Sequence, residues 1–170
     1  MFVLGHLGIG ERLCRPWIRP YSLKAFWLGA LLPDLLDKTT YYSLCWTTGL
    51  SRAALPVIHG TRSFGHTAIF LACCAGLELR KKSPFTQALT WGVISHLILD
   101  ALSDQLIHFP QLPLLTYLPL LWPLSGDFPV SPHSDLAHHL LSANRPFFLV
   151  TELIGGILLF WRTRGSTTSI

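Results

Sequence analysis

The chain has 170 residues, which suggests a single domain over residues 1–170. Half of its residues are hydrophobic and 13% are charged, whereas a typical soluble domain carries about 25% charged residues. The net charge of +4 comes from basic residues in short clusters beside apolar segments, a pattern typical of membrane helices rather than of nucleic-acid binding. The composition therefore argues against a nucleic-acid partner and favours membrane lipids as the surroundings of the protein.

Hydrophobic periodicity and helix-breaking prolines predict five helices along the chain. In chain order they cover approximately residues 2–13, 22–38, 64–81, 83–104 and 145–162. Pro33 is expected to kink the second helix just before its acidic end, because a proline removes one hydrogen bond of the helix. A Pro-rich stretch from His108 to Pro132 separates the fourth helix from the fifth, and we expect it to be interfacial or to re-enter a membrane.

Two fold classes remain open for helices of this composition. No segment reaches about 20 clean apolar residues, the length that crosses a bilayer, because acidic residues or histidines interrupt several of them. A very apolar soluble bundle therefore competes with a small membrane bundle that has a polar interior. The fifth segment favours the membrane, since it is apolar apart from one acidic side chain and is closed by Arg162 and Arg164. We expect an all-α polytopic membrane bundle of four or five helices, with its basic helix ends in the cytoplasm.

Ionisable residues on different predicted helices fall at similar distances from the basic helix ends. His66 and His96 each lie about fourteen residues from the basic turn between their helices, which corresponds to about 20 Å of helix. Asp34 and Asp37 lie about 15 and 20 Å beyond the basic end of their own helix by the same rise. Because these depths agree, we expect the four side chains, His6 and Asp100 to converge on one site in the outer half of the bilayer or at its outer surface.

The residue types at this depth predict a divalent metal ion. Carboxylates are costly inside a membrane, and several together repel one another unless a cation lies among them. The pairs Asp34/Asp37 and His96/Asp100 have spacings of three and four residues, which place both groups on one face of a helix. Imidazole together with carboxylate suits zinc, with manganese and iron as alternatives. The predicted ligands are His6, Asp34, Asp37, His66, His96 and Asp100.

Residues beside these ligands have candidate catalytic roles. Asp37 or Asp104 can act as a general base where the metal does not use the whole carboxylate. Arg62, one helical turn before His66, is either a surface arginine or a clamp on an anionic group such as phosphate. Six ligands exceed what one tetrahedral zinc requires and suffice for two ions that share carboxylates. Each ligand taken alone also has a structural explanation, such as a helix cap or a hydrogen-bonded His–Asp pair.

Short motifs follow one another in a distinctive order: GH at residues 5–6, LLPDLLD at 31–37, RSFGHT at 62–67, SHLILDALS at 95–103 and LWPLS at 121–125. This order resembles the YdjM-like family of inner-membrane metal-dependent hydrolases, and the resemblance implies hydrolase activity in a bacterial cytoplasmic (inner) membrane. Thr61 stands where the family has a histidine, although His59 lies two residues earlier. The positions that the resemblance matches to family motifs are His6, Asp34, Asp37, Arg62, His66, Thr67, His96, Asp100, Ser103, Trp122 and Pro123.

The leading functional hypothesis is a membrane-bound metal-dependent hydrolase, in which a metal-activated water attacks the substrate. The expected outer position of the site and Arg62 suggest a phosphoester or a lipid-linked substrate. A non-catalytic metal carrier or sensor would use the same ligands, and a structural membrane protein would use the His–Asp pairs for packing. The sequence has no HExxH and no GxSxG motif, which argues against a zincin-type protease and against a serine hydrolase.

Overall fold

The structure is a computed structural model that describes residues 3–19, 22–50, 58, 60–108, 119–126, 128 and 146–165. All regular elements in these residues are helical, which confirms the all-α prediction for the described part of the chain. The α-helices are α1 (Gly10–Cys14), α2 (Leu23–Thr48), α3 (Ala68–Lys81), α4 (Pro84–His108) and α6 (Pro146–Gly165). The short turns are the π-helical turn η1 (Gly5–Ile9) and the 3₁₀ turns η2 (Arg15–Trp17) and η5 (Phe64–His66).

The ends of α2 and α3 follow from local backbone signals. The prediction ended the second helix at residue 38, but α2 runs through Pro33 and continues to Thr48. It stops where Gly49 adopts φ +64°, a left-handed conformation that glycine tolerates, and the Gly49 N–H bonds the Cys45 carbonyl at 3.1 Å. α3 begins after Thr67, whose hydroxyl accepts a hydrogen bond from the Phe70 N–H at 3.0 Å.

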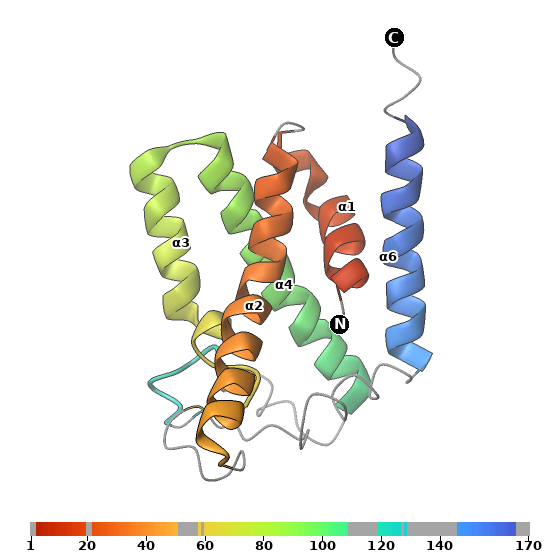
Figure 1. The fold of residues 1–170 in the computed structure, drawn as a ribbon. Coiled ribbons are helices and arrows are strands. Elements are labelled where there is room, and N and C mark those ends of the chain that lie inside the picture. The colour runs from red at the N-terminus through yellow and green to blue at the C-terminus, as the bar shows by residue number, and fades with distance from the viewer. Residues whose placement is uncertain are drawn as a thin grey trace.

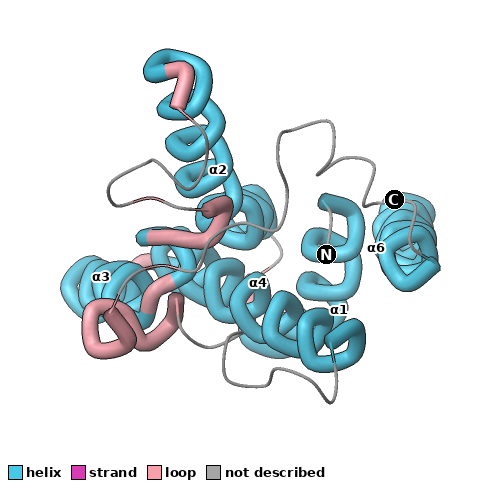
Figure 2. Tube along the Cα trace, turned by 90° about the horizontal axis from the view of Figure 1, so that it is seen from below, coloured by secondary structure: helices cyan, strands magenta, loops and turns pink. Residues whose placement is uncertain are grey.

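Helix α4 is the central element, flanked by α1 and α3 and crossed by α2 (Figures 1 and 2). α2 and α4 approach closely at Gly29 and Gly92. A Cβ added to Gly29 would collide with the Leu89 backbone, and one added to Gly92 would collide with the Phe26 carbonyl. The close approach explains how polar side chains on these two helices, one or two turns further on, can meet across the interface.

Helix α6 packs against the N-terminal turn η1 (Figure 1). Gly8 and Gly155 stand at this contact, where a Cβ on either would collide with backbone of the other segment. The Glu152 carboxylate accepts hydrogen bonds from the N–H groups of Leu4 at 2.9 Å and Gly5 at 2.7 Å. These N–H groups have no partner within their own helix, so Glu152 fixes the start of η1.

A second contact ties the far end of α6 to the N-terminal half of the chain. Arg162 Nε lies 2.9 Å from the Glu11 carboxylate, and the Trp27 indole N–H donates to the same carboxylate at 3.1 Å. The Arg162 guanidinium also stands over the Trp27 ring, 5.5 Å from its centre. The buried Glu11 is thereby paired, as a buried carboxylate requires.

Many large apolar side chains remain exposed on the outside of the bundle. On α6 they include Leu149, Val150, Leu153, Ile154, Phe160 and Trp161. Nevertheless, within the described residues there is no helix that combines the length and the apolar character needed to cross a membrane. The prediction of a membrane bundle is therefore confirmed only in its coarser part, the all-helical fold.

Candidate metal centre

Side chains from four parts of the chain meet in one polar cluster beside the middle of α4. Most of its members are buried: the exposed fraction is 1% for His6, 4% for His66, 0% for His96 and 6% for Asp100. The residues that the structure brings together are His6 from η1, Asp34 and Asp37 from α2, Arg62 and His66 from the segment before α3, and His96, Asp100 and Asp104 from α4.

Four potential ligand atoms have the spacing of a metal site. His66 Nε2 and His96 Nε2 are 3.2 Å apart. Asp34 Oδ1 lies 3.8 and 3.9 Å from these nitrogens, and Asp100 Oδ2 lies 3.5 and 3.7 Å from them. A tetrahedral ion with bonds of about 2.0–2.1 Å separates its ligand atoms by about 3.3–3.4 Å. The two nitrogens thus form one triangle of ligand atoms with Asp34 and a second with Asp100, both close to this spacing. Asp34, His66, His96 and Asp100 are called here the ligand set.

The Asp37 carboxylate orients the ring of His66. Its Oδ2 lies 2.7 Å from His66 Nδ1 and accepts the Ser63 N–H at 2.7 Å, while its Oδ1 accepts the Gly65 N–H at 2.8 Å. An ionised carboxylate can only accept, so His66 Nδ1 carries a hydrogen and donates it. His66 Nε2 then faces the ligand set, in the carboxylate–histidine arrangement common around protein-bound metals.

The ring of His96 is oriented by the backbone of α2. Its Nδ1 lies 2.7 Å from the Ala30 carbonyl oxygen, which can only accept, so Nδ1 is the donor. In neutral His66 and His96 the two Nε2 atoms therefore both present lone pairs, at a separation of 3.2 Å. Two facing lone pairs repel, and a cation or a proton between them removes the repulsion.

The electrostatics of His66 agree with this geometry. Burial alone would lower its pKa, but the carboxylates of Asp100 and Asp37 outweigh burial and raise the pKa of His66 above its ordinary value. The aspartates of the cluster outnumber its lysine and arginine side chains. Its four aspartates are countered by Lys38, which donates to Asp34 at 2.6 Å, and by Arg62. With neutral histidines and ionised aspartates two negative charges remain, which is the charge that one divalent cation balances.

Arg62 pairs with both aspartates on the outer part of α4. One guanidinium nitrogen lies 2.9 Å from Asp100 Oδ2, and the guanidinium also donates to both oxygens of Asp104. The Arg62 side chain is 30% exposed, so the pair lies between the buried ligand set and the surface. Arg62 therefore holds Asp100 and Asp104 in position, and its guanidinium is partly exposed at the edge of the cluster.

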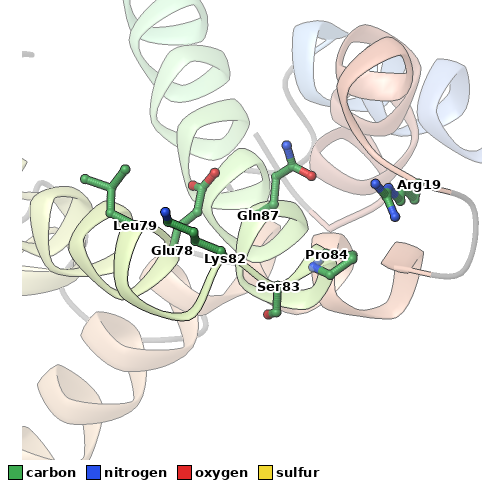
Figure 3. A pocket seen from close by; sticks show the side chains of 7 residues that line it. All are labelled: Arg19, Glu78, Leu79, Lys82, Ser83, Pro84 and Gln87. Atoms are coloured by element: carbon green, nitrogen blue, oxygen red, sulfur yellow. The ribbon is translucent and has the colours of Figure 1, made fainter.

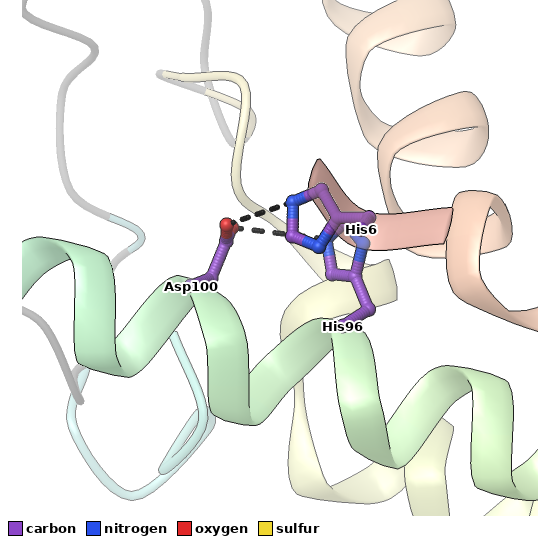
Figure 4. Close-up of side chains that lie close together, drawn as sticks. All are labelled: His6, His96 and Asp100. Carbon is purple, nitrogen blue, oxygen red and sulfur yellow. Dashed lines mark ion pairs between the residues drawn. The ribbon is translucent and has the colours of Figure 1, made fainter. Parts of the chain in front are cut away.

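His6 stands on the other side of His96. The two rings are stacked, with centres 4.1 Å apart and planes 16° from parallel (Figure 4). His6 Nε2 lies 3.2 Å from Asp100 Oδ1. Two groups of possible ligands share His96: one is His6, His96 and Asp100, and the other is Asp34, His66 and His96. Asp37 and Asp104 belong to neither group of possible ligands among the described residues. Their carboxylates are engaged by His66 with its neighbouring backbone and by Arg62.

Other predicted positions have structural roles or lie outside the described residues. The Thr67 hydroxyl caps α3, and the Ser103 hydroxyl donates to the Asp100 carbonyl at 2.9 Å. Trp122 stacks on Phe128, and the segment that carries it reaches the start of α3 through a hydrogen bond from Ala68 N–H to Leu120 O. His59, the candidate replacement for a family histidine, is outside the described residues.

A surface pocket lies at the opposite end of the α3–α4 hairpin (Figure 3). His96 is about 18 Å along α4 from the start of that helix, so the pocket is remote from the ligand set. Its Ser83 hydroxyl accepts the Thr86 N–H at 3.1 Å and so caps α4. The lining residues are Arg19, Glu78, Leu79, Lys82, Ser83, Pro84 and Gln87.

Comparisons of this chain with protein-family models, curated proteins and solved structures found no match. The resemblance to YdjM-like proteins therefore stays a prediction, and function has to be argued from the geometry of the cluster.

Proposed function

We propose that this protein is a metal-dependent hydrolase whose ion is held by Asp34, His66, His96 and Asp100. The observation that carries the proposal is the pair of facing Nε2 atoms, 3.2 Å apart, with one oxygen of Asp34 and one of Asp100 beside them. Two imidazoles with two carboxylates suit zinc, and also manganese or iron. A bound divalent ion would supply Lewis acidity and lower the pKa of a bound water towards about 7.

The surrounding residues of the chain have distinct supporting roles. Asp37 and the Ala30 carbonyl hold the two imidazoles so that Nε2 points inward, which is the orientation that metal binding needs. Arg62 keeps Asp100 in place, and its partly exposed guanidinium favours a substrate that carries negative charge. A phosphoester, free or linked to a lipid, is the substrate class that we propose on this basis.

We also propose that the protein resides in a bacterial cytoplasmic membrane as a multi-pass bundle. The support is the low charge content of the chain and the apolar side chains exposed on α6. Fractionation of cells that express the protein tests this proposal. Recovery in the membrane fraction after an alkaline wash is expected, whereas recovery in the soluble fraction would contradict it.

Metal analysis of the purified protein tests whether it binds the ion that the hydrolase proposal requires. We expect one tightly bound zinc, manganese or iron ion in the wild type, and its loss in His66→Ala and His96→Ala. Glu78→Gln, which changes a carboxylate remote from the cluster, should keep the ion and serves as a control. Circular dichroism shows whether each variant is folded.

A screen of phosphoesters and lipid-linked phosphates follows, with the metal-loaded protein and with the chelated protein. Turnover that depends on the ion supports the hydrolase. A bound ion without turnover of any such substrate would indicate a metal carrier or sensor instead. A folded wild type that neither contains nor takes up an ion would overturn both.

A further inference from the structure

His6 and His96 are poorly oriented to share one ion, although their ligand atoms and that of Asp100 lie within 4.8 Å of one another. An imidazole nitrogen directs its lone pair in the plane of the ring, so an ion bound at about 2.0–2.1 Å lies close to that plane. The planes of His6 and His96 are only 16° from parallel, and the ring centres are 4.1 Å apart (Figure 4). His96 Nε2 faces the other three residues of the ligand set. His6 therefore does not bind the ion held by that set.

The nitrogens of His6 are buried, and no hydrogen bond satisfies either of them among the described residues. The exposed fraction of the residue is 1%, and neither Nδ1 nor Nε2 makes a hydrogen bond. Nε2 lies 3.2 Å from Asp100 Oδ1, but not in hydrogen-bond geometry. Buried polar atoms in proteins are normally satisfied, so an unsatisfied imidazole beside a carboxylate points to a bound cation.

Asp100 stands between His6 and the ligand set. Its Oδ1 faces His6, whereas its Oδ2 faces His66 and His96. A carboxylate whose two oxygens face separate groups of nitrogens is placed to bridge two metal ions. The ions of two-metal sites are about 3.5–4 Å apart, a separation that a bridging carboxylate spans.

We propose that the centre binds a second divalent cation through His6 and Asp100 Oδ1, with Asp100 bridging it to the ion of the ligand set. This inference rests on the proposed function, because the first ion must be present for a bridge to exist. The chain supplies only these two ligands to the second ion within the described residues, so water or substrate oxygens complete its coordination. The second ion should therefore bind more weakly than the first.

The charge of the centre sets the class of ligand that accompanies the second ion. One divalent ion balances the aspartates that Lys38 and Arg62 leave unpaired, as shown above. A second divalent ion then gives the centre an excess of positive charge, which an oxyanion or hydroxide offsets. The inference thus favours a substrate with an anionic oxygen that touches both ions, such as a phosphoryl group.

Titration with Mn²⁺ tests the second site without any activity measurement. Equilibrium dialysis of the full chain should give two Mn²⁺ per wild-type chain, one tight and one at least tenfold weaker. At saturation, electron paramagnetic resonance should show a spin-coupled pair. His6→Gln should bind the tight ion alone and give an uncoupled signal, and Glu78→Gln should behave as the wild type.

Each alternative result has a defined meaning. Saturation of the wild type at one Mn²⁺, or two coupled ions in folded His6→Gln, would overturn the second site while the first ion and the proposed function stand. A wild type that binds no Mn²⁺, zinc or iron would overturn both proposals. If His6→Gln does not fold, the stoichiometry and coupling of the wild type decide alone.

Discussion

Asp37 Oδ2 accepts a hydrogen bond from His66 Nδ1 at 2.7 Å, and this contact joins α2 to the segment that precedes α3. The same carboxylate binds the backbone N–H groups of Ser63 and Gly65. One side chain thus both positions a proposed metal ligand and shapes the backbone that carries it. Asp37 is a positioning residue in this arrangement, although its sequence pattern also predicted a ligand or a general base.

Replacement of Asp37 by asparagine should weaken metal binding. An amide has one acceptor oxygen, so it cannot serve His66, Ser63 and Gly65 together. Loss of such an orienting partner typically lowers metal affinity about 10–100-fold. Competition with a chromophoric chelator measures the change, and Glu78→Gln provides the control. Unchanged affinity in folded Asp37→Asn would show that the His66 ring is held by other contacts.

Replacement of Gly65 by alanine should destabilise the same segment. A Cβ at this position would lie 2.8 Å from the Pro33 carbonyl oxygen and 2.9 Å from Pro33 Cα, so the segment must shift away from α2. Overpacking of this kind costs about 1–3 kcal/mol. In contrast, Gly76→Ala in α3 has open space around the added methyl and should stabilise the helix by about 0.5–1 kcal/mol. The midpoint temperature of thermal unfolding should therefore fall in Gly65→Ala and rise in Gly76→Ala.

Part of the site follows from sequence spacing alone. A separation of four residues puts His96 and Asp100 on one face of a helix, and the structure places both at the ligand set. The matched depths of His66 and His96 on antiparallel segments likewise anticipated their contact. Lys38 was missed, although its spacing of four residues from Asp34 is a known signal for a helical ion pair.

The rest depends on contacts between distant segments, which spacing does not encode. The hydrogen bonds of Asp37 to backbone N–H groups need the local fold of residues 63–66. The stacking of His6 on His96 depends on where α6 fixes the N-terminal turn. The prediction ended α2 at residue 38, whereas the helix continues to Thr48. No proline or glycine lies between residue 38 and Gly49 to stop it earlier.

Without metal, the stability of the fold should depend on pH through His66. The folded-state pKa of His66 is raised by Asp100 and Asp37 against the effect of burial. Its protonation therefore stabilises the metal-free fold below about pH 6.5, and this contribution is lost as the pH rises through the folded-state pKa. Unfolding of the chelated protein between about pH 5 and 8 measures the effect.

The stability of the metal-loaded protein should instead increase with pH. The ion needs the deprotonated Nε2 of His66 and therefore binds more tightly as the pH rises. His66→Asn without metal should lose the His66 contribution to the pH profile. The same profile in wild type and His66→Asn would assign the dependence to another group.

Replacement of Glu152 by glutamine tests whether α6 positions His6. The amide loses the charge and one of the two oxygens that accept from the Leu4 and Gly5 N–H groups, at a cost of about 1 kcal/mol. We expect faster hydrogen exchange in residues 4–10 and weaker binding of the second Mn²⁺, with the first ion unaffected. Glu78→Gln is the matched control, since it makes the same chemical change away from η1. If exchange accelerates but both ions bind as in the wild type, α6 holds the N-terminal turn without setting the position of His6, and His6 is fixed by its stacking on His96.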